Sequence, residues 1–259
     1  MNNGINAFWW TGKKNFGDLL TPELILAYGY TPLETPTQYA AIIGVGSLIE
    51  MVPKNYTGII LGTGLISNTQ IVLEHAKFAA VRGELTKRNL GLPSQIATGD
   101  LGLLAKKLIK NKPTKKRYTV GLIPHFIDKS HPWISKTKDF LGDSCCIINV
   151  QDSARSVIQQ AAQCDLIVSS SLHGIIVSDA LNIKNVWVEL SNKVIGAGFK
   201  FWDYNSAIDY EQPPLIVTTS TRMTEVEKFI SNKSKKKIAN KIVELNKILL
   251  TTLTTIPSN

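Results

Sequence analysis

The fold is indicated by a pattern that occurs twice, YAAIIGVG at residues 39–46 and GIILGTG at residues 58–64. Each copy is a continuous apolar run of strand length that ends in a G-x-G turn. Continuous apolar strands are typical of parallel sheets that helices cover on both faces. Neither turn extends to G-x-G-x-x-G, because Ile49 and Ser67 stand at the third glycine position, and the chain has no P-loop. The turns are therefore interpreted as tight strand-to-helix turns or as close approaches to a ligand.

Strands and helices alternate along the first half of the chain. Strands are expected at residues 5–10, 39–43, 58–61 and 78–81, and helices at residues 21–28 and 84–90. Thr21 is expected to cap the first helix, because Pro22 suits the first helical position. The basic stretch 106–117, with Pro113 near its middle, is the best candidate for a linker.

The alternation restarts after this linker. Strands are expected at residues 119–123, 145–150, 166–168 and 186–188, and helices at 153–163 and 174–181. A last helix carries the apolar stripe Ile238, Ile242, Leu245 and Leu249. We therefore expect an α/β protein of two Rossmann-like domains, residues 1–112 and 113–259, whose parallel sheets face a cleft. Because such sheets bind ligands beyond the carboxyl ends of their strands, the residues there are the site candidates.

Composition limits the possible partners. The 259 residues are 44% hydrophobic and 19% charged, which is enough to fill two cores. The net charge of +9 favours an anionic partner. The lysine clusters at 106–117 and 233–247 interleave no aromatic side chains as a nucleic-acid stacking platform does, so no nucleic acid is expected. No apolar run reaches the ~18 residues that span a bilayer, and no signal peptide is evident, which predicts a cytoplasmic protein.

Two candidate positions follow strands of the first domain. In Asn15-Phe16-Gly17-Asp18, Gly17 allows unusual backbone angles, and Asp18 can cap the next helix or contact a ligand hydroxyl. Arg82 ends the strand 78–81 and precedes Gly83. A guanidinium there can hold a phosphate or carboxylate with two parallel hydrogen bonds, so we favour a ligand role over a surface ion pair.

The sharpest signal is Ser169-Ser170-Ser171-Leu172-His173-Gly174. A strand ends here, three hydroxyl groups follow, and a helix begins. Imidazole suits acid or base work because its reference pKa is close to neutrality. A helix N-terminus also offers free amide groups to an anion. The alternative is a histidine that only caps the turn.

Two further positions follow strands of the second domain. His125 comes after Ile123-Pro124 and can bind an anion or simply pack. Lys200 lies in an aromatic run, residues 199–204, and can bind a phosphate. The aromatic side chains can form a wall for a sugar ring or pack in the core, and core packing is favoured. No group of His, Cys, Asp and Glu has metal-site spacing, so no metal is expected.

Taken in order, these residues resemble the polysaccharide pyruvyltransferases, and most closely the exopolysaccharide branch that decorates succinoglycan-type polymers. The resemblance covers about residues 5 to 205. It rests on the two G-x-G turns and on Asn15-Phe16-Gly17-Asp18, Val81-Arg82-Gly83, Gly99-Asp100, Ile123-Pro124-His125, Ser170-Ser171-Leu172-His173-Gly174 and Phe199-Lys200-Phe201. It implies a fold similar to two-domain GT-B glycosyltransferases.

The resemblance also implies a reaction. Phosphoenolpyruvate is the donor, no cofactor is needed, and the acceptor is a hexose of a surface glycan or of a lipid-linked oligosaccharide. The product is a pyruvate ketal. In the better-known branches, an arginine of the first domain and an arginine two positions before the histidine hold the donor. Arg82 matches the first of these, but Ser171 stands at the second position, so Lys200 or His125 is expected to supply the missing charge.

The resemblance assigns roles on these matches. His173 is the proton donor to C3 of the donor or the base toward the acceptor hydroxyl. Acceptor contacts are implied for Asn15 and Asp18. Donor contacts are implied for Arg82, Ser171, Leu172, Gly174, Lys200 and His125.

Three alternatives stay open at this level. A GT-B glycosyltransferase that uses a nucleotide sugar shares the fold, and a glycan-binding relative without catalysis would explain Ser171. The basic C-terminal helix either packs its apolar stripe on the protein or makes peripheral contact with the cytoplasmic face of the inner membrane. The acceptor sugar, the ketal stereochemistry and the oligomeric state are not encoded in these motifs.

Overall fold

The computed structural model describes residues 3–109 and 115–256. The first part of the chain forms a six-stranded sheet of order β2-β1-β3-β4-β5-β6, in which every neighbouring pair is parallel. Its strands are β1 (Gly4–Phe8), β2 (Thr31–Glu34), β3 (Ile42–Ile43), β4 (Ile59–Leu61), β5 (Lys77–Val81) and β6 (Ala97–Thr98). The two G-x-G turns follow β3 and β4, as the apolar runs predicted.

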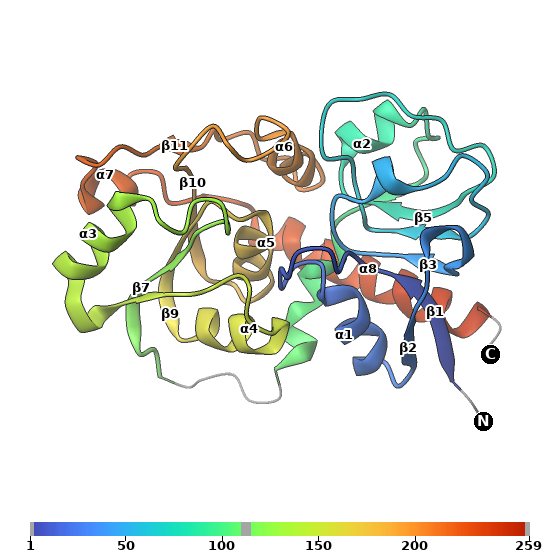
Figure 1. Cartoon of the computed structure of the whole chain (residues 1–259), viewed down its shortest axis with the longest axis horizontal. Helices are drawn as coiled ribbons and strands as arrows, with labels where there is room; N and C mark the ends of the chain where they lie inside the picture. Colours follow the sequence, from blue (N-terminus) through green and yellow to red (C-terminus); the bar gives the residue numbers. More distant parts are fainter. Residues whose placement is uncertain (1–2, 110–114, 257–259) are drawn as a thin grey trace.

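The second part forms a five-stranded parallel sheet of order β11-β10-β9-β7-β8. Its strands are β7 (Tyr118–Ile123), β8 (Cys145–Ile147), β9 (Cys164–Ser169), β10 (Lys184–Glu189) and β11 (Leu215–Ile216). Figure 1 shows the two sheets side by side with helices around them. The expected fold class, an α/β protein with two parallel sheets, is therefore confirmed.

Helices connect the strands. The α-helices are α1 (Leu20–Ala27), α2 (Glu84–Asn89), α3 (Pro132–Leu141), α4 (Ala154–Ala162), α5 (Leu172–Ala180), α6 (Phe199–Ser206), α7 (Met223–Glu227) and α8 (Lys235–Thr255). Short 3₁₀ helices are η1 (Thr37–Tyr39), η2 (Ile49–Met51), η3 (Leu101–Leu108) and η4 (Gly142–Ser144). The sequence analysis did not predict the helix α6, which contains the aromatic run.

Two local expectations were wrong. Thr21 lies inside α1 and not at its N-cap; its hydroxyl accepts a hydrogen bond from the Val45 amide at 2.8 Å and so holds the first G-x-G turn. The expected linker begins too early, because Lys106 to Leu108 belong to η3 and Leu108 is buried. The expected domain boundary at 112/113 lies outside the described residues.

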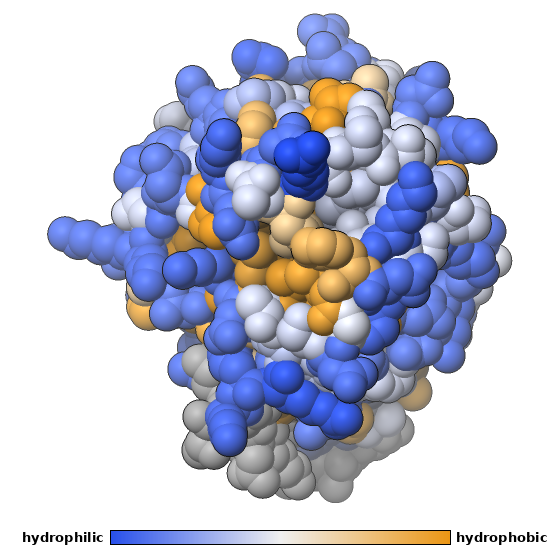
Figure 2. All heavy atoms as spheres, turned by 90° about the vertical axis from the view of Figure 1, so that its left-hand side faces the viewer, coloured by the Kyte–Doolittle hydropathy of each residue, from blue (hydrophilic) through white to orange (hydrophobic). Residues whose placement is uncertain are grey.

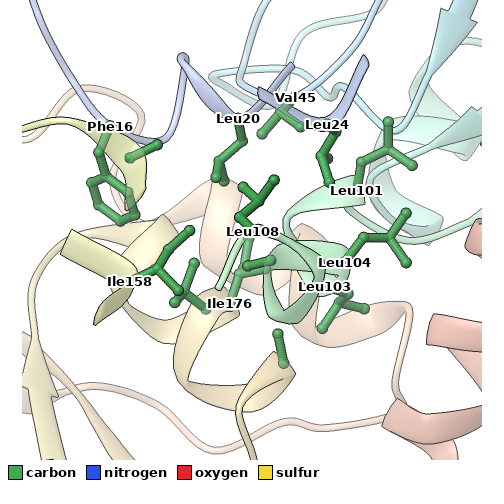
Figure 3. Packing of buried hydrophobic residues seen from close by; sticks show 14 of the residues in the cluster. Phe16, Leu20, Leu24, Val45, Leu101, Leu103, Leu104, Leu108, Ile158 and Ile176 are labelled. Atoms are coloured by element: carbon green, nitrogen blue, oxygen red, sulfur yellow. The ribbon is translucent and has the colours of Figure 1, made fainter. Parts of the chain in front are cut away.

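The two sheets share a hydrophobic core. Figure 3 shows Leu20 and Leu24 of α1, Leu101, Leu104 and Leu108 of η3, and Ile158 and Ile176 from the second part of the chain packed together. All of these side chains are buried. The contact of η3 with α5 is close, since a Cβ on Gly102 would lie 3.0 Å from Cγ2 of Ile176. This core holds the carboxyl ends of the two sheets in a fixed relation.

The last helix, α8, packs against β5 and η3 of the first part of the chain. Ile238, Leu245 and Leu249 of its apolar stripe are buried, with Leu245 against Gly99. The apolar stripe of α8 therefore packs on the protein body, as one of the two interpretations of this helix predicted. Lys233, just before this helix, is not solvated; its ammonium pairs with Asp179 at 2.8 Å and is almost fully buried.

The far end of the second sheet carries an apolar patch among hydrophilic side chains (Figure 2). On this side of the molecule, α3 exposes 82% of Phe140, and the edge strand β8 exposes 43% of Ile147. Within the described part of the chain, no helix is both long and apolar enough to cross a membrane.

Candidate functional site

A pocket of about 320 Å³ lies where the carboxyl ends of the two sheets meet. The first part of the chain lines it with residues after β1 and β3, and the second part with residues after β7, β9 and β10. Seven of the nine sequence-predicted site residues lie in its lining, namely Asn15, Asp18, His125, Ser171, Leu172, His173 and Lys200. Arg82 and Gly174 do not. The other lining residues include Trp10, Ser47, Met51, Ile66 and Ile195.

His173 occupies the first turn of α5 and is 7% exposed. Its ring meets the edge of Phe16, with ring centroids 6.3 Å apart. The ring rests on Gly17 so closely that a Cβ at this position would lie 2.1 Å from Nδ1. On its other side, Nε2 lies 3.7 Å from Oδ2 of Asp100. Gly17 was expected to adopt an unusual backbone angle, but it is not among the positive-φ glycines. Glycine is needed there for a steric reason, the room that the imidazole takes up.

Asn15 and Asp18 shape the wall of the pocket on the side of the first domain. The Asn15 side chain accepts a hydrogen bond from the Gly17 amide at 3.1 Å, which closes the turn before α1. Burial raises the pKa of Asp18 to about 6, against the lowering effect of charges on His173 and Lys200. A carboxyl group with this pKa can both hold and release a proton near neutral pH.

Lys200 is the cation of the pocket. It sits in the first turn of α6, which begins after Gly198 in the left-handed conformation (φ +77°). Burial, followed by repulsion from Arg82, lowers the pKa of Lys200 to about 8. Its ammonium forms no ion pair or hydrogen bond with the described residues. Phe199, Phe201 and Tyr204 of the aromatic run are buried, with Phe201 stacked on Trp187 at 4.4 Å, which agrees with the core packing favoured from the sequence.

His125 follows β7 and lines the pocket from the second part of the chain. Burial, followed by the charge of Lys200, lowers the pKa of His125 to about 4, so the ring is neutral at physiological pH. Its Nδ1 accepts a hydrogen bond from the Ile127 amide at 3.3 Å, which leaves Nε2 to carry the proton. His125 therefore offers a neutral donor to the pocket. It does not replace the missing arginine as a cation.

The start of α5 offers further donors. The amides of its first turn have no partners within the helix, and the Ser171 side chain does not cap them. The Ser171 hydroxyl lines the pocket. The preceding serines are structural, since the Ser169 hydroxyl donates to the carbonyl of Ile123 at 2.8 Å and Ser170 donates to Asp128 at 2.8 Å. Gly174 lies behind the pocket, where a Cβ would come within 2.3 Å of the Ser169 hydroxyl. Its expected donor contact is therefore corrected to a packing role.

Arg82 is the main correction. The prediction placed its guanidinium in the cleft, but the side chain is 0% exposed and pairs with the equally buried Asp203 of α6 at 2.9 Å. Its other nitrogens donate to the Ser47 hydroxyl at 2.6 Å and to the carbonyl of Leu65. Arg82 thus reaches the pocket only through Ser47 and through its electrostatic effect on Lys200. The guanidinium does not face the pocket because it is buried, and a buried guanidinium has to be paired and hydrogen-bonded within the protein.

Sequence reasoning missed the importance of Asp100 and Ser47. Asp100 follows the short strand β6, and its Gly99-Asp100 motif was the signal that could have marked it. Ser47 follows the first G-x-G turn and lines the pocket, where its hydroxyl accepts a hydrogen bond from Arg82. Among residues 3–109 and 115–256, no three His, Cys, Asp or Glu side chains gather closely enough to hold a metal ion.

Comparison with known proteins found two sequence relatives and one solved structure to report. The uncharacterized protein L143 of Acanthamoeba polyphaga mimivirus is 34% identical over 65% of this chain, and the chain spans 60% of that protein. The succinoglycan biosynthesis protein ExoV of Rhizobium meliloti (strain 1021) is 26% identical over 83% of this chain and 68% of its own length. A solved structure, the functionally uncharacterized protein KP1_0663 of Klebsiella pneumoniae, covers 84% of this chain and 94% of its own at 15% identity and a TM-score of 0.48.

The model of the family described as polysaccharide pyruvyl transferase matches residues 3–192, which is well over half of the chain. The matched range includes the whole first sheet, β7 to β10 of the second sheet, and all of the lining residues named above except Ile195 and Lys200. The chain therefore belongs to the polysaccharide pyruvyl transferase family.

Proposed function

We propose that this protein transfers a pyruvyl group from phosphoenolpyruvate to a pair of hydroxyl groups on a hexose and so forms a pyruvate ketal. The hexose belongs to a surface polysaccharide or exopolysaccharide or to its lipid-linked precursor. The family and the similarity to a succinoglycan biosynthesis protein support pyruvyl transfer to a polysaccharide. The site supports the choice of donor.

One observation carries the donor assignment, the unpaired ammonium of Lys200 in a pocket rich in hydrogen-bond donors. A desolvated cation without a partner is costly, and a bound anion removes that cost. Phosphoenolpyruvate brings a phosphate and a carboxylate. Lys200 suits one of these groups, and the amides of the α5 first turn, the Ser171 hydroxyl and Nε2–H of His125 suit the other.

The reaction requires proton transfers at two places. C3 of the enol gains a proton, while the first sugar hydroxyl loses its proton and its oxygen bonds to C2. The second hydroxyl oxygen then bonds to C2 as the C2–O bond to phosphate breaks, and its proton leaves with the phosphate. We assign these proton transfers to His173 and Asp18, which both line the pocket.

The test is mass spectrometry of the product from purified protein, phosphoenolpyruvate and a panel of lipid-linked or aryl hexosides, with phosphate release followed in parallel. The proposal predicts an acceptor that gains the mass of one pyruvic acid less one water, with one phosphate released per product. His173→Ala should abolish turnover and keep the fold. Binding of nucleoside diphosphates without product from phosphoenolpyruvate would support a glycosyltransferase, and glycan binding without phosphate release would support a non-catalytic relative.

A further inference from the structure

Two buried polar atoms in the described part of the chain lack a hydrogen-bond partner, and they face each other. They are Oδ2 of Asp100 and Nε2 of His173, which lie 3.7 Å apart. Asp100 is 0% exposed, so its free oxygen is not in contact with bulk solvent. An unsatisfied buried polar atom destabilises the folded state, and more so when it is charged. Two such atoms at one point are therefore best explained by their interaction with each other.

We propose that Asp100 is the positioning residue of His173: it fixes the proton on Nε2 and so leaves Nδ1 as the nitrogen that works in the pocket. The inference rests on the proposed function for its catalytic meaning, but not for its geometry. In this arrangement, Nε2–H donates to Oδ2 of Asp100. The separation is slightly longer than a hydrogen bond, as catalytic hydrogen bonds often are before a substrate binds.

Among the residues that the structure describes, no other donor reaches Oδ2 of Asp100. Its Oδ1 caps η3 by accepting a hydrogen bond from the Gly102 amide at 2.7 Å. The hydroxyl of Tyr204, which feels the charge of Asp100, donates instead to Asp179 at 2.8 Å. Oδ2 therefore depends on His173 for a partner.

The surroundings also decide which ring nitrogen is free. Nδ1 is the ring atom that a Cβ on Gly17 would meet first, so this nitrogen keeps its place only because residue 17 has no side chain. Nε2 is fully buried without a partner, whereas Nδ1 is not among such atoms. Asp18, the second proton-transfer group, follows Gly17 directly. With Nε2 turned to Asp100, Nδ1 is the nitrogen that borders the pocket. A neutral ring in this tautomer is a base at Nδ1, and the doubly protonated ring is an acid at the same atom.

The pair also joins the two halves of the molecule. Asp100 lies between β6 and η3 of the first part, whereas His173 lies on α5 of the second. The η3–α5 contact, together with Gly99 in a positive-φ conformation (φ +149°), sets where the carboxylate points. The catalytic imidazole is therefore oriented only when the two sheets are correctly packed.

The tautomer can be measured directly by ¹⁵N NMR of histidine-labelled protein at a pH that keeps the imidazoles neutral. The chain has 4 histidines, and a His173→Gln sample identifies the signals of interest. We expect a pyrrole-like Nε2 and a pyridine-like Nδ1 for His173 in the wild type. This readout requires no substrate, so it is independent of whether the proposed reaction is correct.

Asp100→Asn gives the sharpest variant. The Gly102 amide still requires an acceptor, so the Asn oxygen takes the cap and its NH₂ group faces Nε2. The tautomer should then invert, with the proton on Nδ1, while the cap and the melting temperature are nearly unchanged. Asp18→Asn removes a nearby charge without facing Nε2 and is the matched control; it should leave the tautomer as in the wild type.

With phosphoenolpyruvate and an acceptor, Asp100→Asn should lower kcat by about 10²- to 10⁴-fold with little change in the donor KM, as wrong-tautomer variants of histidine dyads do. A wild-type ring protonated on Nδ1, or an Asp100→Asn ring with the wild-type tautomer, would overturn the proposal. The expected tautomers without any pyruvyl transfer would uphold the pair and refute the proposed function instead.

Discussion

Gly17→Ala tests whether the position of the His173 ring matters for catalysis. A Cβ at residue 17 would lie 2.1 Å from Nδ1, whereas ordinary contacts begin at 3.4 Å, so the ring must move by more than 1 Å. The φ angle of Gly17 lies outside the left-handed region, so alanine adds no backbone strain there. A misplacement of about 1 Å in a catalytic group can reduce the rate about 100-fold. We expect turnover to fall by that order while the protein remains folded.

The assay is phosphate release at saturating phosphoenolpyruvate, together with the melting temperature. Gly91→Ala is the control: it has no atom within 4 Å of the new Cβ, but its φ of +63° makes alanine costly. This variant should lose about 1 kcal/mol of stability and keep full activity. If Gly17→Ala retains full turnover, or if both variants lose activity in proportion to stability, the steric reasoning about His173 is refuted.

Three further predictions concern charges. Lys200→Met should weaken phosphoenolpyruvate binding at least about tenfold in calorimetry. Because the pKa of Lys200 is lowered to about 8, donor binding to the wild type should weaken as the pH rises through 8. Binding that does not depend on pH would count against Lys200 as the cation that holds the donor. Asp18→Asn should raise the melting temperature at pH 7.5 but not at pH 3.5. Burial raises the pKa of Asp18 from 3.8 to about 6 in the folded state, so ionisation of this carboxyl group destabilises the fold increasingly as the pH rises from 3.8 to 6 and does not do so below 3.8. Equal shifts of the melting temperature at both pH values would contradict this. Arg82→Met should lower the free energy of unfolding in urea by about 3–5 kcal/mol, because it leaves Asp203 buried and unpaired; a stable variant that only loses donor affinity would restore Arg82 as a ligand.

Much of the site could be predicted from the sequence, because parallel sheets bring the residues after their strands to one edge. His125, Ser171 and His173 follow β7 and β9 directly, and all three line the pocket. Asp18 reaches the same pocket from the first sheet. Position along a strand is a local property, and apolar runs reveal it.

Pairing between distant segments is not local, and here the sequence interpretation failed. The apolar run correctly predicts that Arg82 lies at the end of β5. The sequence around Arg82 gives no sign that Asp203 of α6 neutralises its charge. The same is true of Asp100, whose partner lies on the other side of the domain contact. A charged side chain at a strand end faces either the ligand or the core, and packing decides between the two.

The doubly anionic donor is proposed to bind between the two sheets, on Lys200 and the start of α5. A crystal structure with phosphoenolpyruvate bound tests it most directly. The account predicts one anionic group of the donor within hydrogen-bond distance of Lys200, the other on the first amides of α5, and the Arg82–Asp203 pair intact. Donor density elsewhere, or Arg82 released from Asp203 to hold the phosphate, would contradict it.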